Sequence, residues 1–206
     1  MEIILEHISK RFQKHWIFKD INYSFITPNT YALLGPNGCG KSTLLRILAG
    51  MQNASQGKIH YIDNNVVKTP INEIYKSLSF TAPGQEIIEE LTLREFLSFH
   101  FSFKKIMPEL NIEKIIELIG LGSNSEKPIA DYSSGMKQRV KLAQAIFSDT
   151  ELLFLDEPCT NLDQKGVEQY KQWIEEYGKN RLVIIASNDI REYYFCTHQI
   201  VIEDYK

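Results

Sequence analysis

The sequence predicts an α/β fold whose centre is a parallel sheet. Three short runs, Tyr31–Leu34, Leu152–Leu155 and Val183–Ala186, are apolar at every position, as expected for strands that are buried on both faces. Segments with apolar residues at helical spacing lie between these runs, so helices and strands alternate along the chain. This alternation is typical of α/β proteins.

Strand signals dominate the first third of the chain. The stretches Glu2–Ile8 and Asp20–Thr27 are short and largely alternating, and residues 58–62 and 66–67 form a predicted hairpin around the turn at 63–65. We therefore expect an N-terminal antiparallel β-subdomain beside a mixed, mainly parallel core sheet. A last strand is expected at Ile200–Ile202.

Helices are predicted from the recurrence of apolar residues every three or four positions. One runs from about Lys41 to Ala49, and Gly50 is a plausible stop. Residues from about 86 to 130 form a predicted helical subdomain inserted between strand regions. The apolar stripes that carry these predictions are Leu93, Phe96, Leu97 and Phe101; Ile112, Ile115, Ile116 and Ile119; Met136, Val140, Ala143 and Phe147; and Val167, Tyr170, Ile174 and Tyr177.

Length and composition narrow the class of protein. The chain has 206 residues, 43% of them hydrophobic, which predicts one domain over 1–206 with a sizeable core. A formal net charge of -3 does not favour nucleic acid as a partner. No apolar run is long enough to span a bilayer, and the three cysteines form no paired metal motif. A cytoplasmic protein is expected.

The strongest motif is the segment Gly35–Ser42, which fits the phosphate-loop pattern G-x-x-x-x-G-K-[ST]. Glycines let backbone N–H groups surround a phosphate, and the helix that follows directs its positive end toward it. Lys41 would contact the β and γ phosphates, and the Ser42 hydroxyl would bind Mg²⁺. This motif predicts a phosphate-bearing ligand, bound by Gly35, Asn37, Gly38, Cys39, Gly40, Lys41, Ser42 and Thr43.

An acidic pair follows the apolar run Leu152–Leu155. Because ligands bind at the carboxyl ends of parallel strands, Asp156 is a candidate ligand for Mg²⁺ and Glu157 a candidate base for a water that attacks the γ-phosphate. A third motif, Asp131–Arg139, places Ser133, Ser134 and Gly135 at the start of an amphipathic helix, where hydroxyls and free N–H groups favour an anion.

In this order, the three motifs resemble those of the ATP-binding subunit of ABC transporters, of the small exporter type. Residues 132–136 resemble the family's signature sequence, and Thr160–Asp163 resembles its D-loop. The resemblance implies that Phe12 stacks on adenine, although packing within a strand is the alternative. It also implies that two cassettes, as a homodimer, close head to tail around ATP, with Ser133 and Gly135 contacting the γ-phosphate held by the partner.

The resemblance also implies a separate transmembrane permease, so that the chain would lie on the inner face of the cell membrane. Phenylalanines at 96, 99, 101 and 103 cannot share one helical face. They either pack the helix on all sides or contribute one pair to the permease contact. Two other functions stay open, a soluble ABC ATPase outside transport and a weakly hydrolysing regulatory cassette.

Four positions, in three motifs, depart from the family pattern. Ser134 and Met136 replace a glycine and a glutamine of the signature. Pro83 stands where the glutamine near Mg²⁺ is expected, and Gln85 is the nearest substitute. Asn188 replaces the histidine that contacts the γ-phosphate, and its amide can donate a hydrogen bond but cannot carry a charge. We therefore include Asn188 with Glu157 and Lys41 as candidate catalytic residues.

Overall fold

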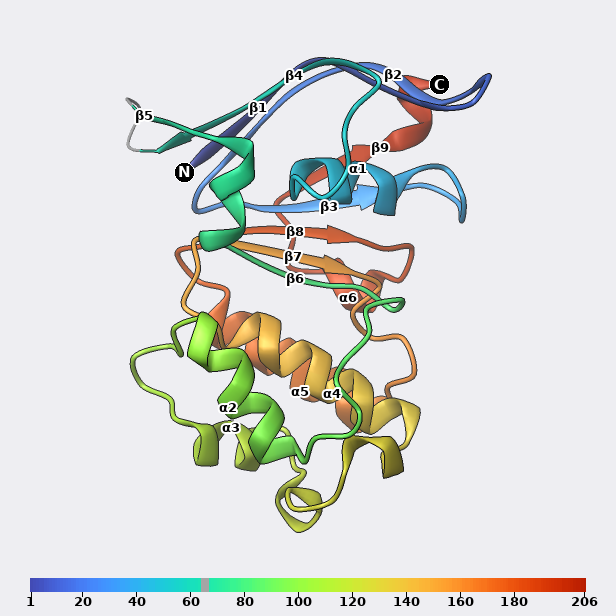
Figure 1. The fold of residues 1–206 in the computed structure, drawn as a ribbon. Helices are drawn as coiled ribbons and strands as arrows, with labels where there is room; N and C mark the ends of the chain where they lie inside the picture. The colour runs from blue at the N-terminus through green and yellow to red at the C-terminus, as the bar shows by residue number, and fades with distance from the viewer. Residues whose placement is uncertain (64–66) are drawn as a thin grey trace.

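An antiparallel sheet covers one side of the molecule in the computed structural model, which describes residues 1–63 and 67–206 (Figure 1). Its strand order is β2-β1-β4-β5, and its pairings are antiparallel. This confirms the predicted N-terminal antiparallel β-subdomain. Of the predicted hairpin, residues 64–66 lie outside the described residues. The four strands are β1 (Glu2–Phe12), β2 (His15–Ile26), β4 (Gln56–Asp63) and β5 (Val67–Thr69).

The core sheet has the strand order β6-β7-β8-β3-β9. All four of its pairings are parallel. Among the strands that the structure describes, antiparallel pairing is found in the other sheet. The three runs that are apolar at every position form the three central strands, which confirms the prediction that they are buried. The strands are β3 (Thr30–Leu34), β6 (Leu78–Thr81), β7 (Leu152–Asp156), β8 (Leu182–Ala186) and β9 (His198–Val201).

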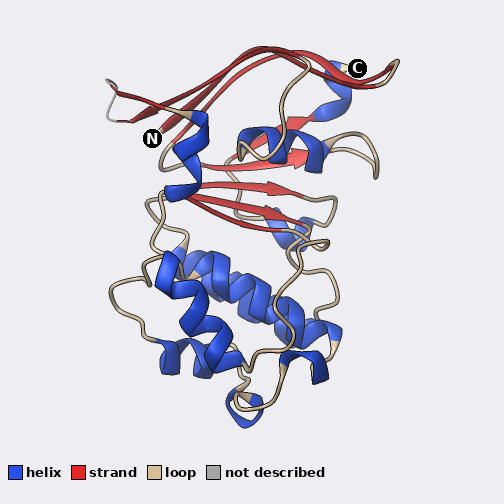
Figure 2. Cartoon of the chain, viewed as in Figure 1, coloured by secondary structure: helices blue, strands red, loops and turns tan. Residues whose placement is uncertain are grey.

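The core sheet separates two hydrophobic cores. Along β7, Leu152 and Phe154 face a core shared with the antiparallel sheet and α1 (Lys41–Leu48), whereas Leu153 and Leu155 face a core shared with the other helices. This follows from the alternation of side chains along a strand. Figure 2 shows the same arrangement, with α1 between the two sheets and the larger helices on the opposite face of the core sheet.

The helical layer consists of α2 (Leu93–Phe103), α3 (Ile112–Leu118), α4 (Ser134–Ile146) and α5 (Gln164–Tyr177). Helix α2 begins at a capping box: the Thr92 hydroxyl accepts from the Glu95 N–H (3.2 Å), and the Thr92 N–H donates to the Glu95 carboxylate (2.9 Å). Short helical elements complete the chain: η1 (Ile71–Lys76), η2 (Gly122–Asn124), η3 (Ile129–Asp131), α6 (Ile190–Tyr193) and η4 (Ile202–Tyr205).

Candidate active site

The phosphate-loop motif forms the turn between the carboxyl end of β3 and the start of α1. Gly35, Gly38 and Gly40 adopt positive φ angles of 138°, 80° and 116°, a region that side chains with a Cβ rarely occupy. At Gly40 space is a second constraint, because a Cβ there would lie 2.5 Å from the Ile17 side chain. The glycines of the motif are therefore required by the shape of this loop.

Lys41 folds its side chain back over the loop. Its ammonium group donates to the carbonyl oxygens of Gly35 (2.7 Å) and Pro36 (3.2 Å), and the residue is buried. The lysine charge is thus held beside the positive end of α1, where both favour a bound anion.

Ser42 and Asp156 meet across the carboxyl edge of the core sheet. The Ser42 hydroxyl donates to Asp156 Oδ1 over 2.9 Å, although the two residues belong to distant parts of the sequence. Burial raises the pKa of Asp156, the nearby Glu157 charge raises it further, and the Ser42 hydrogen bond opposes the rise. A hydroxyl and a carboxylate are oxygen ligands of the type that Mg²⁺ prefers, so the pair fits the predicted metal role.

Replacing Asp156 by Asn should raise the free energy of unfolding at neutral pH by about 0.5–2 kcal/mol. The raised pKa means that the folded protein binds a proton at Asp156 more tightly than the unfolded chain does. This carboxylate therefore lowers stability as pH rises from 3.8 toward the raised pKa. Thermal unfolding from pH 4 to 8 should show Asp156→Asn gaining on the parent over that window. A variant less stable than the parent at pH 7 would contradict the expectation.

Glu157 lies beside the phosphate loop in a cavity of about 230 Å³. Its backbone has φ 43°, a left-handed conformation that is unfavourable for glutamate. The Glu157 N–H donates to the Ala186 carbonyl oxygen of β8 (2.9 Å), which helps to hold this conformation. The cavity is lined by Phe12, Ile17, Asn37, Gly38, Gly40, Lys41, Ser42, Thr43 and Glu157.

Phe12 stands at the rim of the same cavity, at the end of β1. Its side chain is 48% exposed, so it is not packed within the sheet, which was the alternative left open by the sequence. The Lys10 ammonium lies 5.0 Å from the centre of the Phe12 ring. An exposed aromatic ring at the edge of a phosphate site provides a face on which a base can stack.

Asn188 contacts the phosphate loop through a neighbour that the sequence did not single out as its partner. It follows β8, and its side-chain nitrogen donates to Asn37 Oδ1 over 2.9 Å. Asn188, which stands where the family has a histidine, therefore lies at the edge of the cavity that Asn37 lines.

The signature segment begins α4 and does not line this cavity. Ser133 caps the helix, its hydroxyl accepting from the Met136 N–H (3.3 Å), and it is exposed. At Gly135 a Cβ would lie 2.9 Å from the Asn161 carbonyl oxygen, so the start of α4 packs tightly on the D-loop. Within one chain, the structure therefore keeps Ser133 and Gly135 apart from Lys41.

Two side chains without an assigned role in the sequence tie α4 to the segment after Asp156. The buried Gln138 donates to the Pro158 carbonyl oxygen (2.7 Å), and Arg139 forms an ion pair with Asp163 (3.1 Å). The signal that could have revealed Gln138 is its position within a mostly buried helix, where an amide requires a hydrogen-bonding partner.

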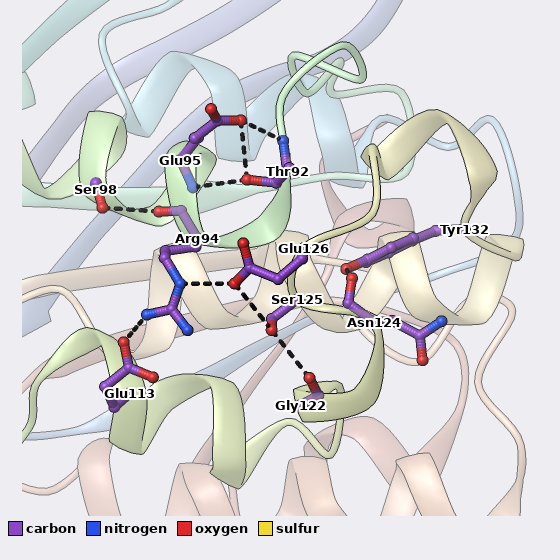
Figure 3. Close-up of polar contacts among 10 residues, drawn as sticks. All are labelled: Thr92, Arg94, Glu95, Ser98, Glu113, Gly122, Asn124, Ser125, Glu126 and Tyr132. Carbon is purple, nitrogen blue, oxygen red and sulfur yellow. Dashed lines mark hydrogen bonds and ion pairs between the residues drawn. The ribbon is translucent and has the colours of Figure 1, made fainter.

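A second polar network holds the other side of the signature segment. Figure 3 shows the Tyr132 hydroxyl donating to the Asn124 carbonyl oxygen, over 2.7 Å. Arg94 of α2 pairs with Glu113 of α3 and with Glu126 (2.8 Å for the latter). Tyr132, directly before Ser133, is thus fastened to the loop that also carries Glu126.

Gln85 is not among the side chains that line the cavity at the phosphate loop. Its side-chain oxygen is buried and has no hydrogen-bond partner among the described residues. Gln85 instead lines a separate cavity of about 230 Å³ with Tyr75 of η1, Phe80 of β6 and His100 of α2. The structure therefore does not bring Gln85 to Ser42, as the predicted metal role would require.

Cys39 directs its side chain away from the cavity. The thiol is buried in the core between the sheets, and the Cys39 N–H donates to the Pro36 carbonyl oxygen (3.1 Å). Its contribution to the loop is therefore made by the backbone.

We expect Cys39 in the folded protein to resist maleimide, with or without ATP, because reagent cannot reach a buried thiol. Mass spectrometry of the labelled protein would measure this, with urea-unfolded protein as the positive control. Rapid labelling that ATP slows would show instead that the thiol faces the nucleotide.

A glycine loop between a buried strand and a helix, with a strand-end aspartate bonded to its serine, defines a P-loop nucleotide-binding protein. The family model of the ABC transporter matches residues 18–160. The chain therefore belongs to the ABC transporter family, and it is an ATP-binding subunit that hydrolyses ATP.

Curated relatives resemble the chain over most of its length. The lantibiotic transport ATP-binding protein SrtF of Streptococcus pyogenes is 29% identical over 191 residues, which cover 90% of this chain and 79% of SrtF. The sulfate/thiosulfate import ATP-binding protein CysA of Synechocystis is 34% identical over 180 residues, 85% of this chain and 50% of CysA. The chain thus spans about half of that longer relative, and relatives named for import match as well as one named for lantibiotic transport.

Solved structures show the same fold. A putative ABC transporter ATP-binding protein from Pyrococcus furiosus superposes with a TM-score of 0.82 at 23% identity, over the full length of both chains. The dimeric ABC transporter cassette MJ0796 superposes with a TM-score of 0.80 at 21% identity, covering 97% of this chain and 93% of that one. No helix in the described part of the chain is both long and apolar enough to cross a bilayer.

Proposed function

We propose that this chain, acting as one domain over residues 1–206, is a separate ATP-hydrolysing subunit that powers a membrane transporter by closing with a second cassette around ATP. The observation that carries the proposal is the contact of Ser42 with Asp156 at the phosphate loop, with Glu157 on the wall of the same cavity. These are the groups that hold a nucleotide and activate water in phosphoryl transfer.

Each side chain of the cavity has one role in this proposal. Phe12 stacks on adenine, while the loop N–H groups and Lys41 hold the β and γ phosphates. Ser42 and Asp156 hold Mg²⁺, which when bound offsets phosphate charge. Glu157 orients a water and takes its proton, and Asn188 donates a hydrogen bond to the γ-phosphate.

A second copy of the chain completes the site. Ser133 is exposed at the amino end of α4, and neither Ser133 nor Gly135 lines the cavity of its own chain. Free N–H groups and the positive end of a helix favour a phosphate. We therefore assign Ser133 and Gly135 to the γ-phosphate held at Lys41 of the other copy, in a homodimer.

The permease contact is assigned to an aromatic pair on α2. Phe99 is 49% exposed and Phe103 77% exposed, and their ring centres lie 5.2 Å apart. Phe96 of the same segment is buried, so the four phenylalanines divide between helix packing and surface. Exposed apolar clusters mark interaction sites. Through such a contact the chain would lie on the inner face of the cell membrane.

Changing Phe99 and Phe103 together to serine should reduce co-purification with the permease at least about 10-fold, since each buried ring contributes more than 1 kcal/mol at an interface. ATP turnover of the isolated cassette should stay within about twofold of the parent. Quantitative mass spectrometry of detergent-solubilised complexes provides the readout. The matched control changes the exposed Ile26 and Val201 to serine. Equal loss in both double variants would remove α2 from the contact.

The proposed function itself is tested by purification from membranes and by phosphate release. A multi-span membrane protein that co-purifies, with ATP turnover that depends on Mg²⁺, is the expected result. Co-purification with a soluble complex would favour an ATPase outside transport. ATP binding without phosphate release would favour a regulatory cassette.

A further inference from the structure

A cavity of about 850 Å³ lies at the edge of the core sheet opposite the phosphate loop. Its walls come from the residues that precede β6, β7 and β8 and from the segment that follows α2. In Figure 1 these strands begin on the left, whereas their carboxyl ends point to the right. The cavity is therefore separate from the ATP site.

Positive charge dominates this cavity. Its lining includes Lys76, Lys104, Lys105, Lys179 and Arg181. Among the described residues, two carboxylates, those of residues 149 and 151, share the lining. One of these, at 151, already pairs with the N-terminal amine, and Lys76 pairs with a neighbouring glutamate. The remaining four cations have no carboxylate within 4.0 Å among the residues that the structure describes.

Arg181 is the most deeply placed of these cations, with only 4% of the residue exposed. It donates to the Ile146 carbonyl oxygen (2.8 Å) and to the Thr150 hydroxyl (2.6 Å), while its Nε has no partner in the described part of the chain. Burial lowers its pKa to about 10, and Arg181 in turn helps burial to lower the pKa of Lys104. The Asp149 charge opposes the fall in the Arg181 pKa. The Lys104 ammonium donates to the carbonyl oxygens of Tyr75 and Leu78. Burying two adjacent cations is still costly, and a bound anion would lower that cost further.

Size and rim chemistry indicate the class of anion. The volume is within the range of small-molecule sites. Tyr75, 60% exposed, stands at the wall and offers a ring face for stacking. Multiply charged phosphates match clustered lysine and arginine donors.

We propose that this cavity is a second anion site, which binds the phosphate or pyrophosphate group of a small molecule between Arg181, Lys104, Lys105 and Lys179. The group comes either from a soluble phosphorylated compound or from a phospholipid head. Binding of the phosphate group in this cavity does not depend on ATP hydrolysis at the phosphate loop.

Titration calorimetry with inorganic pyrophosphate, on protein saturated with a non-hydrolysable ATP analogue and Mg²⁺, tests the site. We expect binding that the analogue does not displace. The double variant Lys105→Glu, Lys179→Glu should weaken it at least about 10-fold, because two charge-assisted contacts are lost. The control variant Lys58→Glu, Lys127→Glu changes the net charge equally at exposed positions outside the cavity and should bind as the parent does.

A parallel measurement uses phosphatidylcholine vesicles with and without phosphatidate. Vesicle binding that only the first double variant loses, without binding of free pyrophosphate, assigns the anion to a lipid head. Absence of binding in both measurements, or equal loss in the control variant, would overturn the proposal. Both double variants alter exposed side chains, so circular dichroism should show unchanged folding.

Discussion

Glu157→Gln should lower ATP turnover at least about 100-fold, the lower range for loss of a general base. Glutamine keeps the shape of the side chain but cannot take a proton from water. ATP binding should persist, because Lys41 and the loop that contact the phosphates are unchanged. The ATP-bound dimer should therefore accumulate. Phosphate release gives turnover, and light scattering with ATP gives the dimer fraction.

The matched control for this variant is Glu168→Gln, an exposed glutamate on α5 that does not line the cavity. It should hydrolyse ATP at the parent rate. Near-normal turnover in Glu157→Gln would show that another group activates the water, and dimer accumulation would then be absent as well.

Asn188→Ala should lower turnover roughly 10–150-fold, the effect of losing one hydrogen bond to a charged group in the transition state. The amide of Asn188 donates to Asn37 Oδ1 in this structure, at the cavity edge. A γ-phosphate oxygen is a stronger acceptor for the same donor. Asn188→His should retain or raise activity, because imidazole can donate an equivalent bond. Steady-state phosphate release with saturating ATP measures both variants.

Asn37→Ala separates a contact with phosphate from a contact within the loop. If Asn188 acts on the γ-phosphate, losing Asn37 should reduce turnover less than losing Asn188. Equal losses in the two alanine variants, with no recovery in Asn188→His, would limit Asn188 to supporting the loop.

Local sequence was sufficient to predict the phosphate loop and the buried strands. The loop needs glycines at left-handed positions such as Gly40, and a strand buried on both faces leaves no polar position in Leu152–Leu155. The closeness of Ser42 to Asp156 also followed from the sequence. Asp156 ends one strand and Ser42 comes shortly after another, and the carboxyl ends of strands in a parallel sheet lie at the same edge.

Other features depend on tertiary contacts that carry no local signal. From the sequence, the thiol of Cys39 could have faced either the ligand or the core. In the structure it is buried in the core that the phosphate loop shares with the antiparallel sheet. The position of Gln85 depends on how the loop after β6 leaves the sheet, which spacing from Leu91 does not determine. The Asn188–Asn37 bond joins two loops that only the pairing of β3 with β8 brings together.

The pairing of β3 also has a consequence for how the protein is made. Both neighbours of β3, which ends at Leu34, are late strands: β8 begins at Leu182 and β9 at His198. A chain emerging from the ribosome therefore exposes the apolar strand before the phosphate loop long before either neighbour exists. Long-range pairing of this kind is slow and leaves apolar surface exposed in the meantime. The ATP site consequently assembles only after synthesis has passed β8, so nascent chains that stop earlier should neither bind nucleotide nor resist aggregation.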